Sequence, residues 1–502
     1  MSPHARRVLL VLEACVVVAT LVVAWETLGA MLARRPVAFD LEWMEGAVLV
    51  TALRARDGLP LHTVPDADWI PLIYPPLHAW ILGALAHVAT LDHALGRTLS
   101  LGCTAVATGA LVVAARAHGV RWPLACGAAG LFLGCWVDGG TFYDLVRIDA
   151  LAMALLALAL VLGAQPARRA TVASALVLAL AFATKHHAAV FGVPIAAWCW
   201  REHGWRRAAL FAACSAVPAL AFTAWMQVRS DGAFLRLLLE VPASHGIVAA
   251  RALPSIVRGR LEGAQAELWR ALPITTTALL VLGRSLPRRG YWLGVGATAL
   301  GVASIMRGHV GGYLNVLIPC LWVQCLLPVL VGGGGDPLRN ASPLGVAEVP
   351  GWRGWRPHLA TALVAMQLVE GRDPLARTVP TAADADRAAR LVARVRELPG
   401  PVLSPYAPWL PVQAGHPPAP ALIALWDIDH AGGPYRAQVR AFDDAMRAGR
   451  WASVLTPDGK LGHGLLDAYV PGPALGVEGP ATRTGWPVRV RRVWVPRDRN
   501  GP

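Results

Sequence analysis

The sequence predicts an all-α, polytopic membrane protein of about ten to twelve transmembrane helices, followed by a small soluble α/β domain. Of the 502 residues, 55% are hydrophobic and 16% are charged, whereas a soluble protein carries roughly a quarter charged residues. The apolar residues are concentrated in long windows, which is typical of membrane spans rather than of one large soluble core. The end of the chain lacks such windows and alternates helix-like with strand-like segments.

The apolar windows begin near the N-terminus and continue to about residue 331. A spanning helix needs roughly 20 residues, with about 17 as a lower limit. The first window follows Arg6 and Arg7 and lacks the short apolar core and cleavage site of a signal peptide, so we expect an uncleaved span with these arginines in the cytoplasm. The windows lie at 8–28, 72–91, 98–115, 123–137, 150–164, 170–184, 188–200, 208–226, 271–283, 291–306 and 313–331, with a weaker one at 358–369.

Polar stretches divide the chain into predicted domains. Residues 1–331 form the multispan domain, with a first external loop at 29–71 and a second large loop at 228–270. Residues 332–375 contain a Gly/Pro-rich linker, VGGGGDPLRNASPLG, and the weaker window as a candidate last span. Residues 376–502 form the soluble domain, which we expect outside the cell membrane, on the periplasmic side.

The soluble domain has recognisable local patterns. TAADADRAARLVARVREL, at 381–398, has helical periodicity with Thr381 as its N-cap. A second helix is expected in PYRAQVRAFDDAMRAG, and strands in PVLS, ASVLT and VRVRRVWV. This alternation predicts a small α/β fold.

Charge and cysteine content exclude other classes of protein. The net charge of +14 comes from arginines in short loops and in the tail, so we interpret it as a topology signal and headgroup contact rather than nucleic-acid binding. The eight cysteines lie in apolar windows without a CxxC pair, which is typical of small buried hydrophobic residues rather than of zinc ligands or disulfides. The Ala/Gly/Pro/Arg-rich composition with two lysines indicates a high-GC bacterial gene.

The basic loops constrain the topology. If the first loop is external and every window crosses, three basic loops also lie outside, against the positive-inside rule; they are RAHGVRW (116–122), QPARRA (165–170) and REHGWRR (201–207). One window between 72 and 115 is therefore expected either not to cross or to be split. The residues that this arrangement brings to the face of the first loop are Asp144, Arg147, Asp149 and Lys185.

The first loop carries three carboxylates in a short stretch, FDLEWMEG, as Asp40, Glu42 and Glu45. Charges near hydrocarbon are costly, and they either face water or serve a function; the spacing alone fits both interpretations. The next segment, GAVLVTALRARDGLPLH, predicts a helix on the membrane surface that ends at Asp57-Gly58. Tyr74 then opens the run YPPL, whose prolines suit a first helical turn.

Together these motifs resemble the GT-C superfamily, the multispan glycosyltransferases that use polyprenyl-phosphate sugars, and especially its protein mannosyltransferase and lipid A aminoarabinose transferase members. The family pattern of an acidic pair, a glycine after a surface helix and a PPL reads here as WMEG…DG…YPPL. FYDLVRIDALAMALLALAL, ALAFATKHHAAVFGVP and GGYLNVLIP are similar to later family segments, and ELPGPVLSPYAPWLPVQAGHPP is similar to a domain appended in bacterial members. Two departures stand out: the acidic pair is not contiguous, and Tyr74 stands where lysine is common.

The resemblance implies an inverting transfer of a sugar to an acceptor at the external face of the plasma (inner) membrane. A carboxylate would take the acceptor's proton, and cationic groups would stabilise the leaving phosphate. By its spacing from Gly58, Glu45 is the expected base, then Asp40, then Glu42. The expected donor-phosphate ligands are Arg147, Lys185 and Arg307, and the expected lining residues are Tyr74, Asp149, His309 and Asn315. Structural alternatives stay open: Arg147 as a partner of Asp149 or Asp144, Lys185 reaching to the membrane surface, and His309 as a structural residue.

The implied partners are a polyprenyl-phosphate-sugar donor, membrane lipids, and a glycan, lipid or protein acceptor, without nucleic acid. No cofactor is identified; a divalent metal ion stays open, and no metal ligand is assigned. WDIDH, at 426–430, could bind a cation or be a solvated loop. A multispan transporter and a non-catalytic membrane protein with a binding tail are the alternative functions. The absence of an evident inverted repeat, and the crowding of acids in one loop rather than at the bilayer midplane, count against the transporter.

Overall fold

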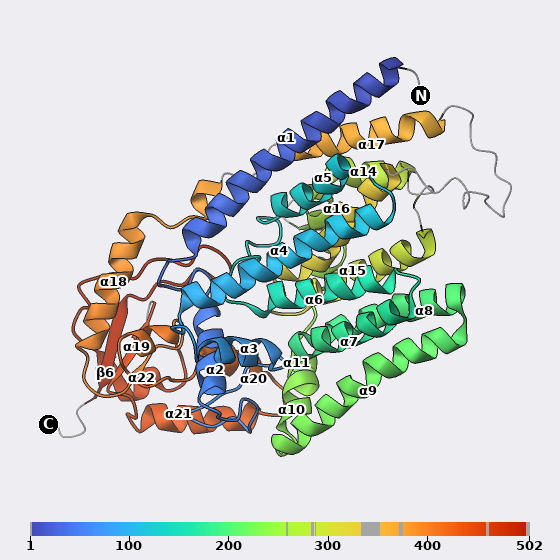
Figure 1. Ribbon diagram of the computed structural model, residues 1–502. Helices are drawn as coiled ribbons and strands as arrows, with labels where there is room; N and C mark the ends of the chain where they lie inside the picture. The colour runs from blue at the N-terminus through green and yellow to red at the C-terminus, as the bar shows by residue number, and fades with distance from the viewer. Residues whose placement is uncertain are drawn as a thin grey trace.

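The computed structural model describes residues 3–257, 260–282, 286, 288–332, 352–370, 375–457 and 461–497. A slab of roughly parallel helices carries the C-terminal domain at one end (Figure 1). Helix α1 (Pro3–Arg34) lies along one edge beside α17 (Trp352–Val369), and α9 (Trp205–Arg229) lies along the other. The helices between them are α4 (His93–Ala117), α5 (Trp122–Gly134), α6 (Ile148–Gly163), α7 (Arg168–Thr184), α8 (Gly192–His203), α14 (Pro273–Leu282), α15 (Arg289–Gly308) and α16 (Ile318–Gly332).

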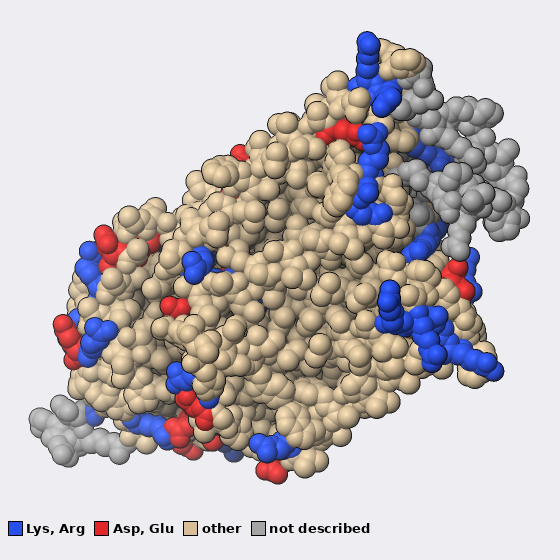
Figure 2. Space-filling view, viewed as in Figure 1, with Lys and Arg blue, Asp and Glu red and all other residues tan. Residues whose placement is uncertain are grey.

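The surface of this slab is that of a membrane protein. By length and composition, four helical segments of the described chain can cross a membrane: Pro3–Arg34, His93–Ala117, Trp205–Arg229 and Leu314–Gly332; α5 and α6 are shorter apolar helices. Large apolar side chains point outward, including Trp25 at 83% exposure and Leu220 at 67%. Figure 2 shows charged side chains gathered toward the two ends, with a broad band of other residues between them. The expected polytopic helical fold is confirmed.

Helix α3 (Leu77–Leu85) explains how the basic loops can satisfy the positive-inside rule, because it is too short to cross. Nine residues of helix extend roughly 13 Å, which is less than half of the hydrocarbon thickness. Helix α3 lies against α2 (Glu45–Arg56), where a Cβ on Gly83 would meet the carbonyl oxygen of Ala52 at 2.9 Å. The window at 72–91 thus stays at the end that carries the first loop, and α4 makes the crossing.

The basic loops lie together at the opposite end, beside the N-terminal part of α1. Arg121 pairs with Glu13 of α1 at 2.9 Å. The indole of Trp292 donates to His118 at 3.2 Å, and Arg288 donates to the carbonyl of Ala164. These contacts bring the loops after α4 and α6 to the start of α15, so the chain satisfies the positive-inside rule with the first loop at the other end.

The C-terminal domain has the expected mixed architecture. Helix α18 (Ala382–Arg396) begins at a capping box formed by Thr381 and Asp384. The sheet order is β3-β4-β6-β5, in which β3 and β4 are parallel and the other pairs are antiparallel. The elements are β3 (Val402–Leu403), α19 (Trp409–Gln413), α20 (Leu422–Ile428), α21 (Val439–Arg447), β4 (Ser453–Thr456), α22 (Leu465–Ala468), β5 (Tyr469–Pro471) and β6 (Arg492–Pro496).

This domain shares an apolar core with the first loop. Val48 and Leu49 of α2 belong to the same buried cluster as Trp409 and Ile423 of the C-terminal domain. The approach is so close at Gly46 that a Cβ there would lie 3.0 Å from the backbone nitrogen of Trp409.

The remaining stretches of the chain are the second large loop and the linker before the C-terminal domain. The second large loop holds the short helices α10 (Ala233–Leu235), α11 (Val241–Ser244) and α12 (Ala249–Ala252), a hairpin of β1 (Ser255–Val257) and β2 (Arg260–Glu262), and α13 (Ala264–Ala271). The Gly/Pro-rich linker lies mostly outside the described residues, and the weaker apolar window forms part of α17. The domain boundaries themselves stay predictions.

Candidate functional site

A chain of buried charges lies where the first loop meets the ends of three other segments. An oxygen of Glu42 lies 3.2 Å from a terminal nitrogen of Arg147, and Arg147 Nε lies 3.6 Å from Asp149 Oδ2. Asp149 Oδ1 accepts from Lys185 Nζ at 2.7 Å and from Asn315 Nδ2 at 2.8 Å. All five side chains are buried, with exposures between 2% and 9%. We call this group the Arg147 network.

Local structure explains why these residues converge. Arg147 is the extended residue before α6, and Asp149 lies in the first turn of that helix, where a carboxylate is favoured by the helix dipole. Lys185 is the extended residue that ends α7. Asn315 lies in the short 3-10 helix η4 (Leu314–Leu317) that precedes α16. Three helix termini therefore meet at one place, and each contributes at least one polar side chain.

Electrostatics in the network favour a charged Arg147 and a titratable Glu42. Burial disfavours the Arg147 cation, but Glu42, Tyr74 and Asp149 together raise the pKa of Arg147 above its ordinary value. Burial raises the pKa of Glu42 to about 7, opposed by Arg147. Burial also raises the pKa of Tyr74, whose side chain hydrogen-bonds Arg147, to about 12, so its phenol stays neutral.

Glu45 lies in a different environment, although it is only three residues from Glu42. Its carboxylate accepts from Arg97 at 2.7 and 3.0 Å, from the backbone N–H of Leu41 at 2.6 Å and from that of Val146 at 2.8 Å. Burial alone would raise the pKa of Glu45, but Arg97 and these donors lower it to about 2. A fully hydrogen-bonded carboxylate of this kind favours a structural role over the expected role as base.

Arg97 connects Glu45 to the backbone of the first loop. Its guanidinium donates to the carbonyl oxygens of Arg34, Val37 and Phe39 as well as to Glu45. Next to it, Arg34 Nε lies 3.1 Å from Asp144 Oδ2, and both side chains are fully buried. These pairs fix the loop that presents Glu42 to Arg147. Neither pair could be identified from the sequence, because Arg97 and Arg34 lie near window edges, where arginine usually marks topology.

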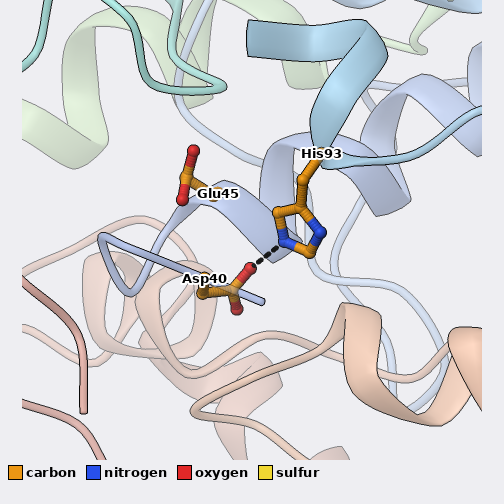
Figure 3. Close-up of side chains that lie close together, drawn as sticks. All are labelled: Asp40, Glu45 and His93. Carbon is orange, nitrogen blue, oxygen red and sulfur yellow. Dashed lines mark hydrogen bonds and ion pairs between the residues drawn. The ribbon is translucent and has the colours of Figure 1, made fainter. Parts of the chain in front are cut away.

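The third acid of the loop, Asp40, bonds to a histidine. Asp40 Oδ1 lies 2.7 Å from His93 Nε2, and Figure 3 shows the carboxylate of Glu45 beside this pair. Asp40, Glu45 and His93 offer three ligand atoms within 4.8 Å of one another, which could hold a metal ion. The donor set fits a cation poorly, because the oxygens of Glu45 are already bound by Arg97 and by two amides.

The structure places two expected site residues elsewhere. Arg307 forms a forked pair with Glu267, with distances from 2.7 to 3.1 Å, and lines a cavity of about 670 Å³ between α1, α5, α13 and α17. His309 donates from Nε2 to the carbonyl of Pro242 at 2.9 Å. Arg307 was expected to bind the donor phosphate and His309 to line the site, but in the structure these two side chains bond to Glu267 and Pro242 of the second large loop.

The fold and the buried site together define a polytopic helical membrane protein with a network of charges at one end of its bundle. No protein-family model and no curated protein sequence matches the chain. Among solved structures, it is similar to ArnT from Cupriavidus metallidurans bound to undecaprenyl phosphate, with 14% identity, a TM-score of 0.55, and coverage of 93% of this chain and 97% of that one. The apo structure of the same ArnT gives 16% identity, a TM-score of 0.56, and coverage of 95% and 97%. The likeness shows that the chain shares the fold of these ArnT structures along nearly its whole length.

Proposed function

We propose that this protein is a membrane glycosyltransferase that moves a sugar from a polyprenyl phosphate to an acceptor at the external face of the membrane. The observation that carries the proposal is the Arg147 network: two buried cations, Arg147 and Lys185, meet carboxylates at the end of the bundle opposite the basic loops. Support comes from the fold, which is shared with an ArnT structure that binds undecaprenyl phosphate.

The proposed reaction uses Glu42 as the base. Glu42 takes the proton of an acceptor hydroxyl or amine as that atom forms a bond to the anomeric carbon of the sugar. The bond between this carbon and the phosphate oxygen breaks on the opposite side, which inverts the anomeric centre, and the electron pair remains on the lipid phosphate. A pKa of Glu42 of about 7 suits this task, because a base works best when its pKa lies near the working pH.

Arg147 and Lys185 are the proposed phosphate ligands. Charge-assisted hydrogen bonds from guanidinium and ammonium groups stabilise the negative charge that grows on a leaving phosphate. In the structure both cations are held by Asp149, and Asn315 fixes the same carboxylate. Asp149 and Asn315 are therefore positioning residues, which keep the cations aimed at one point until a phosphate replaces the carboxylate contacts.

Donor entry requires the site to open. The cavities beside the network are small, about 20 Å³ next to Tyr74 and about 20 Å³ next to Lys185. The cavity of about 670 Å³ lies one turn away, because its wall includes Tyr313 and Leu314, which directly precede Asn315. We propose that a lipid donor reaches the network laterally from this cavity, between α1 and α17.

The test is donor turnover by the purified full chain in lipid nanodiscs. The probes are undecaprenyl phosphates that carry labelled sugars, supplied with an envelope lipid and glycan extract as acceptor, and the readout is free undecaprenyl phosphate. We expect turnover with at least one sugar, and a loss of at least 100-fold for Arg147→Ala. Arg394→Ala is the matched control, because Arg394 forms a half-exposed pair on α18. Turnover that is absent with every sugar, or equal in the two variants, contradicts the proposal; sugar transport without release of lipid phosphate would indicate a transporter.

A further inference from the structure

A buried histidine beside the Arg147 network has no hydrogen-bond partner on either ring nitrogen. His78 lies in the first turn of α3 and is 1% exposed. Among the histidines of the described residues, it is the one whose Nδ1 and Nε2 are both buried and unpartnered. Leaving a buried polar atom unpaired costs free energy, and such atoms in native proteins usually mark a bound water, an ion or a functional role. His78 therefore needs a partner that the chain itself does not supply.

The position of His78 connects it with the proposed phosphate ligands. It shares the wall of a cavity of about 20 Å³ with Tyr74 and with Ile148, the residue between Arg147 and Asp149. Tyr74 in turn hydrogen-bonds Arg147. Asp149 raises the pKa of His78 and Arg147 lowers it, so both charges act on the ring. The imidazole thus lies beside the proposed phosphate site.

The protonation state of the ring shows which kind of partner is missing. Burial lowers the pKa of His78 to about 4, so the ring is neutral and offers one N–H donor and one acceptor nitrogen. His62 lines the same cavity, and its Nε2 lies 2.9 Å from the carbonyl oxygen of Tyr74. Because a carbonyl oxygen only accepts, His62 Nε2 carries the hydrogen, and the unpartnered His62 Nδ1 is an acceptor.

One water molecule can satisfy the two acceptor nitrogens but not the donor. A cavity of about 20 Å³ has room for about one water, which can donate one hydrogen to His62 and the other to His78. The N–H of His78 is then left without an acceptor. The partner that His78 needs from a ligand is therefore a hydrogen-bond acceptor.

A lipid phosphate supplies such an acceptor. Its oxygens are negatively charged, and hydrogen bonds to a charged acceptor are stronger than those between neutral groups. Arg147 precedes α6 and Lys185 ends α7, whereas His78 comes from α3, so the three side chains approach from different helices. A neutral donor adds a hydrogen bond to the phosphate without the desolvation cost of a further buried charge.

We propose that His78 is a third ligand of the donor phosphate and donates its ring N–H to a phosphate oxygen held by Arg147 and Lys185. The other ring nitrogen accepts from a water that also donates to His62. The inference rests on the proposed function, because it concerns the same phosphate. Its consequence is selectivity: the site favours the phosphorylated lipid over the free polyprenol.

The experiment measures binding of labelled undecaprenyl phosphate to the purified full chain in nanodiscs, with undecaprenol as the probe that lacks phosphate. His78→Phe keeps a planar ring but has no donor. We expect it to bind undecaprenyl phosphate about 10–100-fold more weakly, to bind undecaprenol as the parent chain does, and to keep or raise the thermal midpoint, because two unpaired nitrogens are removed. His78→Gln, which keeps an N–H, should recover part of the affinity. The matched control is His358→Gln, because His358 is also buried but bonds the carbonyl of Ala5, at 2.7 Å, at the opposite end of the bundle.

The outcomes separate this inference from the proposed function. Unchanged affinity for undecaprenyl phosphate in a folded His78→Phe overturns the inference, and so does an equal loss of undecaprenol binding, which would make His78 a packing residue. A parent chain that does not bind undecaprenyl phosphate, or Arg147→Ala that binds it as tightly as the parent, contradicts the proposed function itself. If His78→Phe does not fold, solid-state NMR of the parent chain with ¹⁵N-labelled histidine decides: a ring nitrogen should show a dipolar coupling to the bound phosphorus, and the absence of any such coupling overturns the inference.

Discussion

Two carboxylates in one loop, Glu42 and Glu45, offer a direct test of which acid serves as the base. In Glu45→Gln the side chain keeps its size but loses the charge that faces the buried Arg97. Each oxygen of Glu45 accepts from Arg97 and from at least one backbone amide, so either orientation of the new amide turns an N–H toward other N–H groups. Removing one partner of a buried ion pair costs about 3–5 kcal/mol.

We therefore expect Glu45→Gln to lower the thermal midpoint strongly. Glu42→Gln leaves the buried Arg147 paired with Asp149, so it should lower the thermal midpoint less than Glu45→Gln does. Its turnover should fall by about 10²–10⁴, the contribution of a general base. The assays are tryptophan fluorescence during heating and release of undecaprenyl phosphate, on the same nanodisc samples. A stable but inactive Glu45→Gln together with an active Glu42→Gln would refute the assignment and restore Glu45 as the base.

Other consequences follow from the same contacts. Because Glu42 must be deprotonated to act and its pKa is about 7, kcat/KM should fall about tenfold per pH unit below 7 and level off above it, and Glu42→Gln should flatten this profile. Arg147→Lys should reduce kcat/KM for the donor about 10–100-fold, since one point charge replaces a forked donor worth about 1.5–3 kcal/mol. Lys185→Met should lose activity in the same assay, with partial recovery in Lys185→Arg. Arg34→Met should lower the free energy of unfolding by about 3–5 kcal/mol, measured by thermal midpoint, because Asp144 is left buried and unpaired, and Arg34→Met/Asp144→Leu should recover part of it.

The fold was predictable because its signals are local. Long apolar windows, a capping residue at Thr381 and basic loops can each be identified without knowing what lies nearby in space. The charge rule even identified the region of the non-crossing segment, which the structure places at α3. Residues beside helix ends, such as Arg147 and Lys185, were also predictable, since charge at the edge of an apolar window implies a partner or water.

The roles of the acids were not predictable, because each depends on a distant partner. The carboxylate of Glu45 is fully hydrogen-bonded in this fold only because Arg97, 52 positions away, binds it. Burial raises the pKa of Glu42, and Arg147, which comes from a segment 105 positions away, opposes that shift. The sequence shows the order of the acids along the loop, whereas their pKa values depend on burial and on contacts with residues that are distant in sequence.

The C-terminal domain contributes directly to the environment of the proposed base. Gly485 has a φ of +70°, and a Cβ there would lie 3.0 Å from Glu42 Cγ and Oε1, so the domain closes over this carboxyl with backbone. The neighbouring Thr484 donates to the carbonyl of Gly140 at 2.6 Å, and the N–H of Arg483 donates to that of Leu41 at 2.7 Å, which anchors the cover on both sides. Burial is the largest cause of the raised pKa of Glu42. It follows that the domain tunes the base: without this cover, water would reach Glu42, its pKa would fall toward 4.5, and its affinity for the acceptor's proton would fall with it.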